Sequence, residues 1–74
     1  MGDLGGWAGK DVVRILEKKG YVILRQRGSH VRMRHPNAAH RKPITVPLHH
    51  ELKTGLLRQI ISDAGMTVKE FLQQ

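Results

Sequence analysis

The chain has 74 residues, enough for one domain with one small core and too few for the deep, enclosed active site of a larger enzyme. It carries a net charge of +7 and no cysteine, which excludes a disulfide scaffold and a thiolate zinc site and fits a reducing cytoplasm. With 39% hydrophobic residues, the core is expected to need nearly all apolar side chains, leaving few for a lipid pocket or a large apolar interface. The longest apolar run, residues 21–24, is too short to span a bilayer.

The first predicted element is a helix over residues 9–19. Its apolar residues recur at helical spacing, and Gly20 provides a C-terminal stop. The preceding residues 1–8 are glycine-rich and lack the order of a signal peptide. We expect them to be a flexible segment in front of a single domain at residues 9–74, with Trp7 packing on the edge of the core.

A hairpin of two strands is predicted after this helix. Residues 21–26 are β-branched and aromatic, as in a strand, but they are apolar on both faces, so their inward side is not determined. Gly28 favours a tight turn because glycine adopts positive φ without steric cost. Residues 30–35 then alternate, which places Val31 and Met33 on a buried face and the basic residues on a wet face.

The remaining elements are a short strand and two helices. A polar loop leads to a strand at residues 44–46 that Pro47 ends, and Thr67 with Glu70 forms a capping-box pattern at the start of a short final helix. The sequence therefore predicts an α+β fold of order α-β-β-β-α, with a short final helix and with helices on one face of a three-stranded antiparallel sheet. This topology matches a double-stranded-RNA-binding domain. The long helix before Gly65 has an apolar stripe formed by Leu52, Leu56, Leu57, Ile60, Ile61 and Ala64.

The positive charge is concentrated in the middle of the chain. Residues 1–20 carry a net charge of +1 and residues 51–74 a net charge of 0, whereas residues 21–50 carry +6 and no acidic residue. Such a segment is typical of a surface that binds nucleic acid, because clustered cations neutralise phosphates. A charged sheet edge that prevents aggregation is the alternative. The six cations are Arg25, Arg27, Arg32, Arg34, Arg41 and Lys42.

His30 is the candidate catalytic residue of this segment. RNA is cut without metal when a base removes the 2′-hydroxyl proton and the oxygen attacks the adjacent phosphate, and histidine is suited to proton transfer near neutral pH. Arg32 and Arg34 share its strand face and are expected to hold phosphates, while Gly28 and Ser29 form the adjacent turn. Spacing alone is equally compatible with an exposed strand histidine that has no role.

The other four histidines are expected to be less important. His35 lies on the Val31 face and is predicted to pack or to anchor the loop, and His40 in that loop is expected to be solvated. The adjacent pair His49 and His50 is a poor chelating arrangement, since neighbouring side chains on an extended chain point apart. We therefore predict no metal site.

Several motifs resemble the HicA-like toxins of type II toxin-antitoxin systems, from residue 9 onward. These motifs are Gly28-Ser29-His30 after the helix exit "EKKGY", His35-Pro36, "TVP" at residues 45–47, and "LKTGLLRQIISDAGMTVKEF" at residues 52–71. The loop at residues 36–43 is longer than the family pattern, and "MGDLGGWA" at the start has no counterpart in it.

The resemblance implies an mRNA-cleaving endoribonuclease without cofactor or metal, with the histidine at position 30 as catalytic residue. It also implies a HicB-like antitoxin as protein partner. We expect a cytoplasmic toxin that is monomeric when alone. A non-catalytic RNA-binding module of the same fold and an interaction protein for an acidic partner remain as alternatives. The residues expected to bind RNA are Gly28, Ser29, Arg25, Arg27, Arg32, Arg34 and Lys42.

Overall fold

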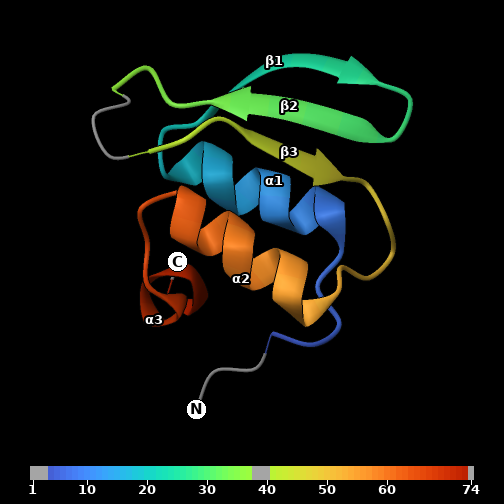
Figure 1. Cartoon of the computed structure of the whole chain (residues 1–74), viewed down its shortest axis with the longest axis vertical. Helices are drawn as coiled ribbons and strands as arrows, with labels where there is room; N and C mark the ends of the chain where they lie inside the picture. Colours follow the sequence, from blue (N-terminus) through green and yellow to red (C-terminus); the bar gives the residue numbers. More distant parts are fainter. Residues whose placement is uncertain (1–3, 38–40, 74) are drawn as a thin grey trace.

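The computed structural model describes residues 4–37 and 41–73, which form a three-stranded sheet with helices on one of its faces (Figure 1). The sheet is antiparallel, with the second strand between the other two. The predicted α+β class and the predicted order of elements are confirmed. In chain order these are α1 (Gly9–Lys18), β1 (Val22–Arg27), β2 (His30–Arg34), β3 (Ile44–Pro47), α2 (Thr54–Asp63) and α3 (Val68–Leu72).

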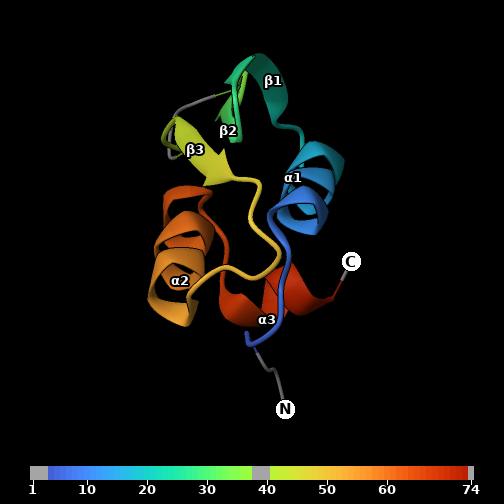
Figure 2. The same ribbon diagram turned by 90° about the vertical axis from the view of Figure 1, so that its right-hand side faces the viewer.

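The core lies between the sheet and the helices. Figure 2 shows α1 and α2 side by side beneath the sheet, with α3 below them. Val31 and Met33 of β2 point into this core and are buried, whereas His30 and Arg34 of the same strand are exposed. The alternation predicted for β2 is therefore correct, and it places the basic side chains on the sheet face opposite the helices.

The hairpin between β1 and β2 has a two-residue turn. Arg27 is paired with His30, so only Gly28 and Ser29 connect the two strands. Gly28 has a φ of 56°, and every residue with positive φ in the described chain is a glycine. Glycine at the first turn position matches the type II′ geometry, whose twist fits that of the flanking strands. The predicted role of Gly28 in the turn is confirmed.

β1 departs from the prediction, because none of its residues is buried on either face. The strand begins at Val22 and not at Tyr21, and Tyr21 itself is buried in the core. β1 is an edge of the sheet, and it packs less closely on the helices than the opposite edge strand β3, which contacts both α1 and α2. Val22, Ile23 and Leu24 are 46%, 48% and 53% exposed. The expectation that nearly all apolar side chains would be used in the core was therefore wrong.

The C-terminal helices follow the predicted pattern with two corrections. Leu52 is buried but precedes α2, which begins at Thr54. Leu56 is 40% exposed, because it lies about 100° around the helix from the buried Leu57 and so at the margin of the stripe. The capping box is confirmed, since the Thr67 hydroxyl accepts a hydrogen bond from the amide of Glu70, and the Glu70 carboxylate accepts one from the amide of Thr67.

The described part of the N-terminal segment, residues 4–8, packs against the domain. Leu4 is buried in the core, and the Trp7 ring meets the edge of Phe71 with 5.0 Å between ring centroids. The carbonyl of Trp7 accepts a hydrogen bond of 2.8 Å from the amide of Leu52. Trp7 therefore packs at the edge of the core, as expected, and Leu4 adds to the core an apolar side chain that precedes α1.

Candidate active site and nucleic-acid interface

His30 is the first residue of β2 and lies on the sheet face that the described helices leave uncovered. It is paired with Arg27 on one side and with Pro47 of β3 on the other. Directly opposed residues of antiparallel strands project to the same face. The imidazole of His30 therefore has the Arg27 side chain beside it on the open face.

A shallow hollow surrounds His30 on this face. Its lining includes three arginines and no carboxylate, and it draws residues from all three strands. The Arg32 guanidinium donates a hydrogen bond of 3.0 Å to the hydroxyl of Thr45, which orients it across the central and third strands. An arrangement of guanidinium groups without an acidic neighbour favours the binding of phosphate. The residues that line the hollow are Arg25, Arg27, His30, Arg32 and Thr45.

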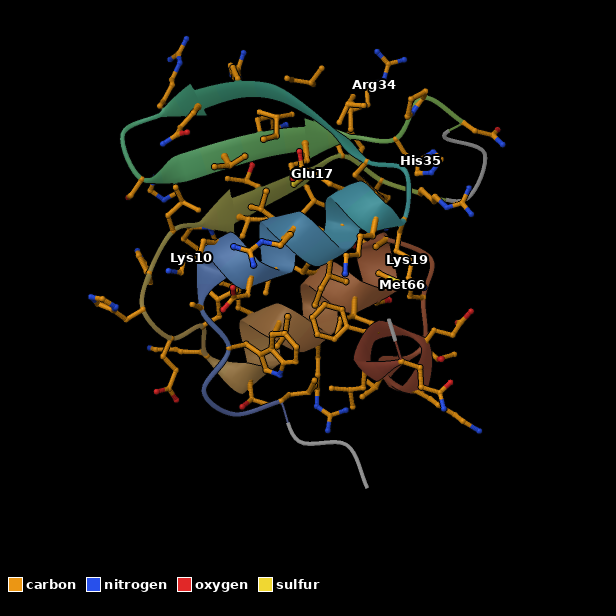
Figure 3. The ribbon with its side chains drawn as sticks, turned by 180° about the vertical axis from the view of Figure 1, so that it is seen from behind. Lys10, Glu17, Lys19, Arg34, His35 and Met66 are labelled. Atoms are coloured by element: carbon orange, nitrogen blue, oxygen red, sulfur yellow. The ribbon has the colours of Figure 1, made fainter. Side chains whose placement is uncertain are left out.

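Two predicted RNA-binding residues lie away from this hollow. Arg34 is at the other end of β2, roughly 13 Å from His30 at about 3.3 Å per residue. Figure 3 shows it projecting from the sheet on the side away from the helices, above His35. Lys42 precedes β3, and its amide donates a hydrogen bond of 2.8 Å to the carbonyl of Asp63 at the end of α2. The structure thus brings Arg25, Arg27 and Arg32 together with His30 and separates Arg34 and Lys42 from it.

The turn residues Gly28 and Ser29 lie next to His30, and both are exposed. Space is open around Gly28, since a methyl group built on it would meet no atom within 4 Å. The carbonyl of Ser29 accepts a hydrogen bond of 2.6 Å from the amide of Leu48. Ser29 therefore ties the hairpin turn to the segment that follows β3.

His49 is the residue of this site that sequence analysis missed. It follows the end of β3 and faces His30, with 6.5 Å between the two ring centroids. On its sequence position alone, His49 was considered only as a metal ligand, together with His50. The pairing of the strands could have revealed this contact. Aligning the apolar residues of β2 and β3 sets Pro47 opposite His30, so the residues that follow Pro47 pass beside His30.

The remaining histidines do not join this site. His35 packs edge-on against Tyr21, and its Nε2 atom lies 3.1 Å from the carbonyl of Lys19, so the predicted anchoring role is confirmed. Its Nδ1 atom accepts a hydrogen bond from the amide of Asn37. His40 lies outside the described residues. Among residues 4–37 and 41–73, no group of three or more histidine or carboxylate side chains is placed to hold a metal ion.

The comparisons with known proteins identify the family of the chain. A family model described as "HicA toxin of bacterial toxin-antitoxin" matches residues 9–66, which is well over half of the sequence and includes all three strands. No curated protein matches the chain. No helix in the described residues has the length and apolar character needed to cross a membrane. Because the family model matches residues 9–66, the chain belongs to the HicA family of toxins from bacterial toxin-antitoxin systems.

Proposed function

We propose that this HicA family member is an endoribonuclease that cleaves mRNA in the cytoplasm without a metal ion, with His30 as the catalytic residue. One observation carries the proposal: His30 is exposed on the open sheet face, in a hollow that it shares with three arginines. A histidine supplies proton transfer and arginines supply phosphate binding, and both contribute to cleavage at a 2′-hydroxyl.

In the proposed reaction, His30 removes the proton of a 2′-hydroxyl and that oxygen attacks the adjacent phosphorus. Arg27 and Arg32 bind the non-bridging oxygens and offset the negative charge that develops on them. Removal of such a charge-stabilising donor from an enzyme costs on the order of 100-fold to 1000-fold in rate. The products are a cyclic phosphate and a 5′-hydroxyl, and water is not the nucleophile.

RNA binding is proposed to extend along the open face from this hollow. Arg25 of β1 lines the hollow, and Arg34 lies farther along the same face. Gly28 and Ser29 form the open turn at one end, where the backbone of a nucleic acid has room to approach. Lys42, at the opposite end of the sheet, is proposed to contact only a substrate long enough to pass along β2.

A cleavage assay with chemically modified RNA tests the reaction. We expect the purified protein to cut single-stranded RNA in the presence of a metal chelator, because no step uses a metal ion. Replacing the 2′-hydroxyl by hydrogen at the cleaved linkage should abolish cutting there, since the nucleophile is removed. The matched control is the same oligonucleotide with the 2′-hydroxyl removed one linkage away. Binding without any scission would instead support the non-catalytic RNA-binding alternative.

The proposed protein partner is a HicB-like antitoxin that covers this face. An open nuclease site must be blocked when the toxin is held inactive, and the cluster of arginines attracts an acidic inhibitor. Val22 of β1 is paired with Arg34 and so lies on the same face, where its exposed apolar side chain adds surface for an inhibitor to bury.

Hydrogen exchange in the complex tests this mode of inhibition. The amides of β1 and of the turn at residues 28–29 are expected to exchange more slowly when the antitoxin is bound, because an edge strand and a turn are covered. RNA cleavage should be suppressed at the same ratio of the two proteins. Slower exchange confined to α2 and α3 would contradict occlusion of the site.

A further inference from the structure

The two histidines of the site come from segments far apart in the chain. His30 begins β2, and His49 lies just beyond β3, yet their ring centroids are 6.5 Å apart and their planes are inclined by 72°. Both side chains are exposed, so neither is held there by burial in the core. A specific arrangement of the backbone therefore positions the two rings.

That arrangement is visible in the hydrogen bonds on either side of His49. The amide of Leu48 donates to the carbonyl of Ser29, at 2.6 Å, and the carbonyl of His49 accepts from the amide of Gly9, at 2.9 Å. Ser29 immediately precedes His30, and Gly9 is the first residue of α1. The main chain of His49 is thus fastened between the hairpin turn and a helix terminus. Both anchors use backbone atoms and leave the imidazole available.

Cleavage of RNA by its own 2′-hydroxyl needs two proton transfers. A base removes the proton from the attacking 2′-oxygen, and an acid gives a proton to the departing 5′-oxygen, which is otherwise a poor leaving group. The attacking and leaving oxygens lie on opposite sides of the phosphorus, roughly in line. One side chain cannot contact both at a hydrogen-bonding distance of about 2.6–3.2 Å, so a second group is required.

We propose that His49 is this second group, the general acid that protonates the leaving 5′-oxygen. The inference rests on the proposed RNA cleavage and adds a residue to it. The phosphate lies between the two rings, with the attacking 2′-oxygen of the adjacent ribose toward His30 and the leaving 5′-oxygen toward His49. The O2′–P bond forms as the P–O5′ bond breaks, His30 gains the 2′-hydroxyl proton, and His49 loses its proton to the 5′-oxygen. Solvent then restores both histidines, so no other reactant is consumed.

A substrate whose leaving group needs no proton tests the acid role. The first probe is an RNA oligonucleotide that the unmodified protein cuts; the second replaces the bridging 5′-oxygen at that linkage by sulfur, which departs as a thiolate. On the oxygen substrate, His49→Ala should lower the rate on the order of 100-fold to 10,000-fold. On the sulfur substrate, the same variant should recover most of the rate of the unmodified protein. His30→Ala should stay slow on both, because the base is still missing.

The adjacent residue provides a matched control. His50 is also an exposed histidine, and His50→Ala should cleave both substrates at the rate of the unmodified protein. His49→Ala should keep its melting temperature, since its anchoring bond uses the main-chain carbonyl. Full activity of His49→Ala on the oxygen substrate, or equal loss on both substrates, would overturn the acid role. Undiminished cleavage by His30→Ala would instead overturn the proposed function, so the two failures are distinguishable.

Discussion

Replacement of His30 by alanine is expected to abolish RNA cleavage while leaving the fold and most of the RNA affinity intact. The loss should be on the order of 100-fold to 10,000-fold, which is the usual contribution of a positioned proton-transfer group. His30 is exposed at the start of β2, so its truncation opens no cavity in the core. Cleavage rates under single-turnover conditions, together with thermal melts, measure the two effects separately.

Arg32→Ala is the matched comparison for this variant, because Arg32 lies two residues away on the same face and is assigned to phosphate binding. It should weaken RNA binding and reduce the dependence of log affinity on log salt by about 0.7, the value for one phosphate contact on a single strand. His30→Ala should keep the salt dependence of the unmodified protein. A folded His30→Ala protein that cleaves RNA at the original rate would exclude His30 as the catalytic residue.

Replacement of Gly9 by alanine is expected to destabilise the protein and to reduce cleavage, although Gly9 contacts no substrate. A methyl group on Gly9 would overlap the carbonyl oxygen of Pro47 and lie 2.9 Å from the Cα atom of Leu48. Both are backbone atoms and cannot turn aside, so α1 and the segment before His49 must separate. Overpacking of this kind typically costs about 1–3 kcal/mol.

This cost is large for a chain of 74 residues. A domain of this size has a total stability of roughly 4–11 kcal/mol, and each kcal/mol lowers the melting temperature by about 4–8 °C. Cleavage at a temperature where the variant is folded should also fall, because a displacement of about 1 Å in a catalytic group can cost on the order of 100-fold. Melting curves and single-turnover rates of the same preparation report the two effects.

Gly55→Ala is the control for the Gly9 variant. Gly55 lies in α2, and a methyl group built on it meets no atom within 4 Å. Alanine there should raise stability by about 0.5–1 kcal/mol and leave cleavage unchanged, since it favours the helix without touching the site. If Gly9→Ala cleaved RNA as fast as Gly55→Ala, the contact between α1 and the segment after β3 would have no part in positioning the site.

The sequence by itself was sufficient to predict the elements and the orientation of the central strand. The two-residue period of β2 assigns Val31 and Met33 to the core and His30 to the open face, because side chains alternate along any strand. The capping box of Thr67 and Glu70 and the positive φ of Gly28 are likewise local. Each depends on a few consecutive residues, so each could be read before the fold was known.

Only the tertiary structure decided which distant residues meet at the site. The exposure of Val22, Ile23 and Leu24 depends on how far the helix layer extends beneath β1, which the apolar pattern of that strand does not encode. Lys42 is separated from His30 because it lies at the other end of β3. His49 reaches His30 through the register of β2 with β3 and through bonds to Ser29 and Gly9. Such contacts join residues about 20 to 40 positions apart, and periodicity carries no information over that separation.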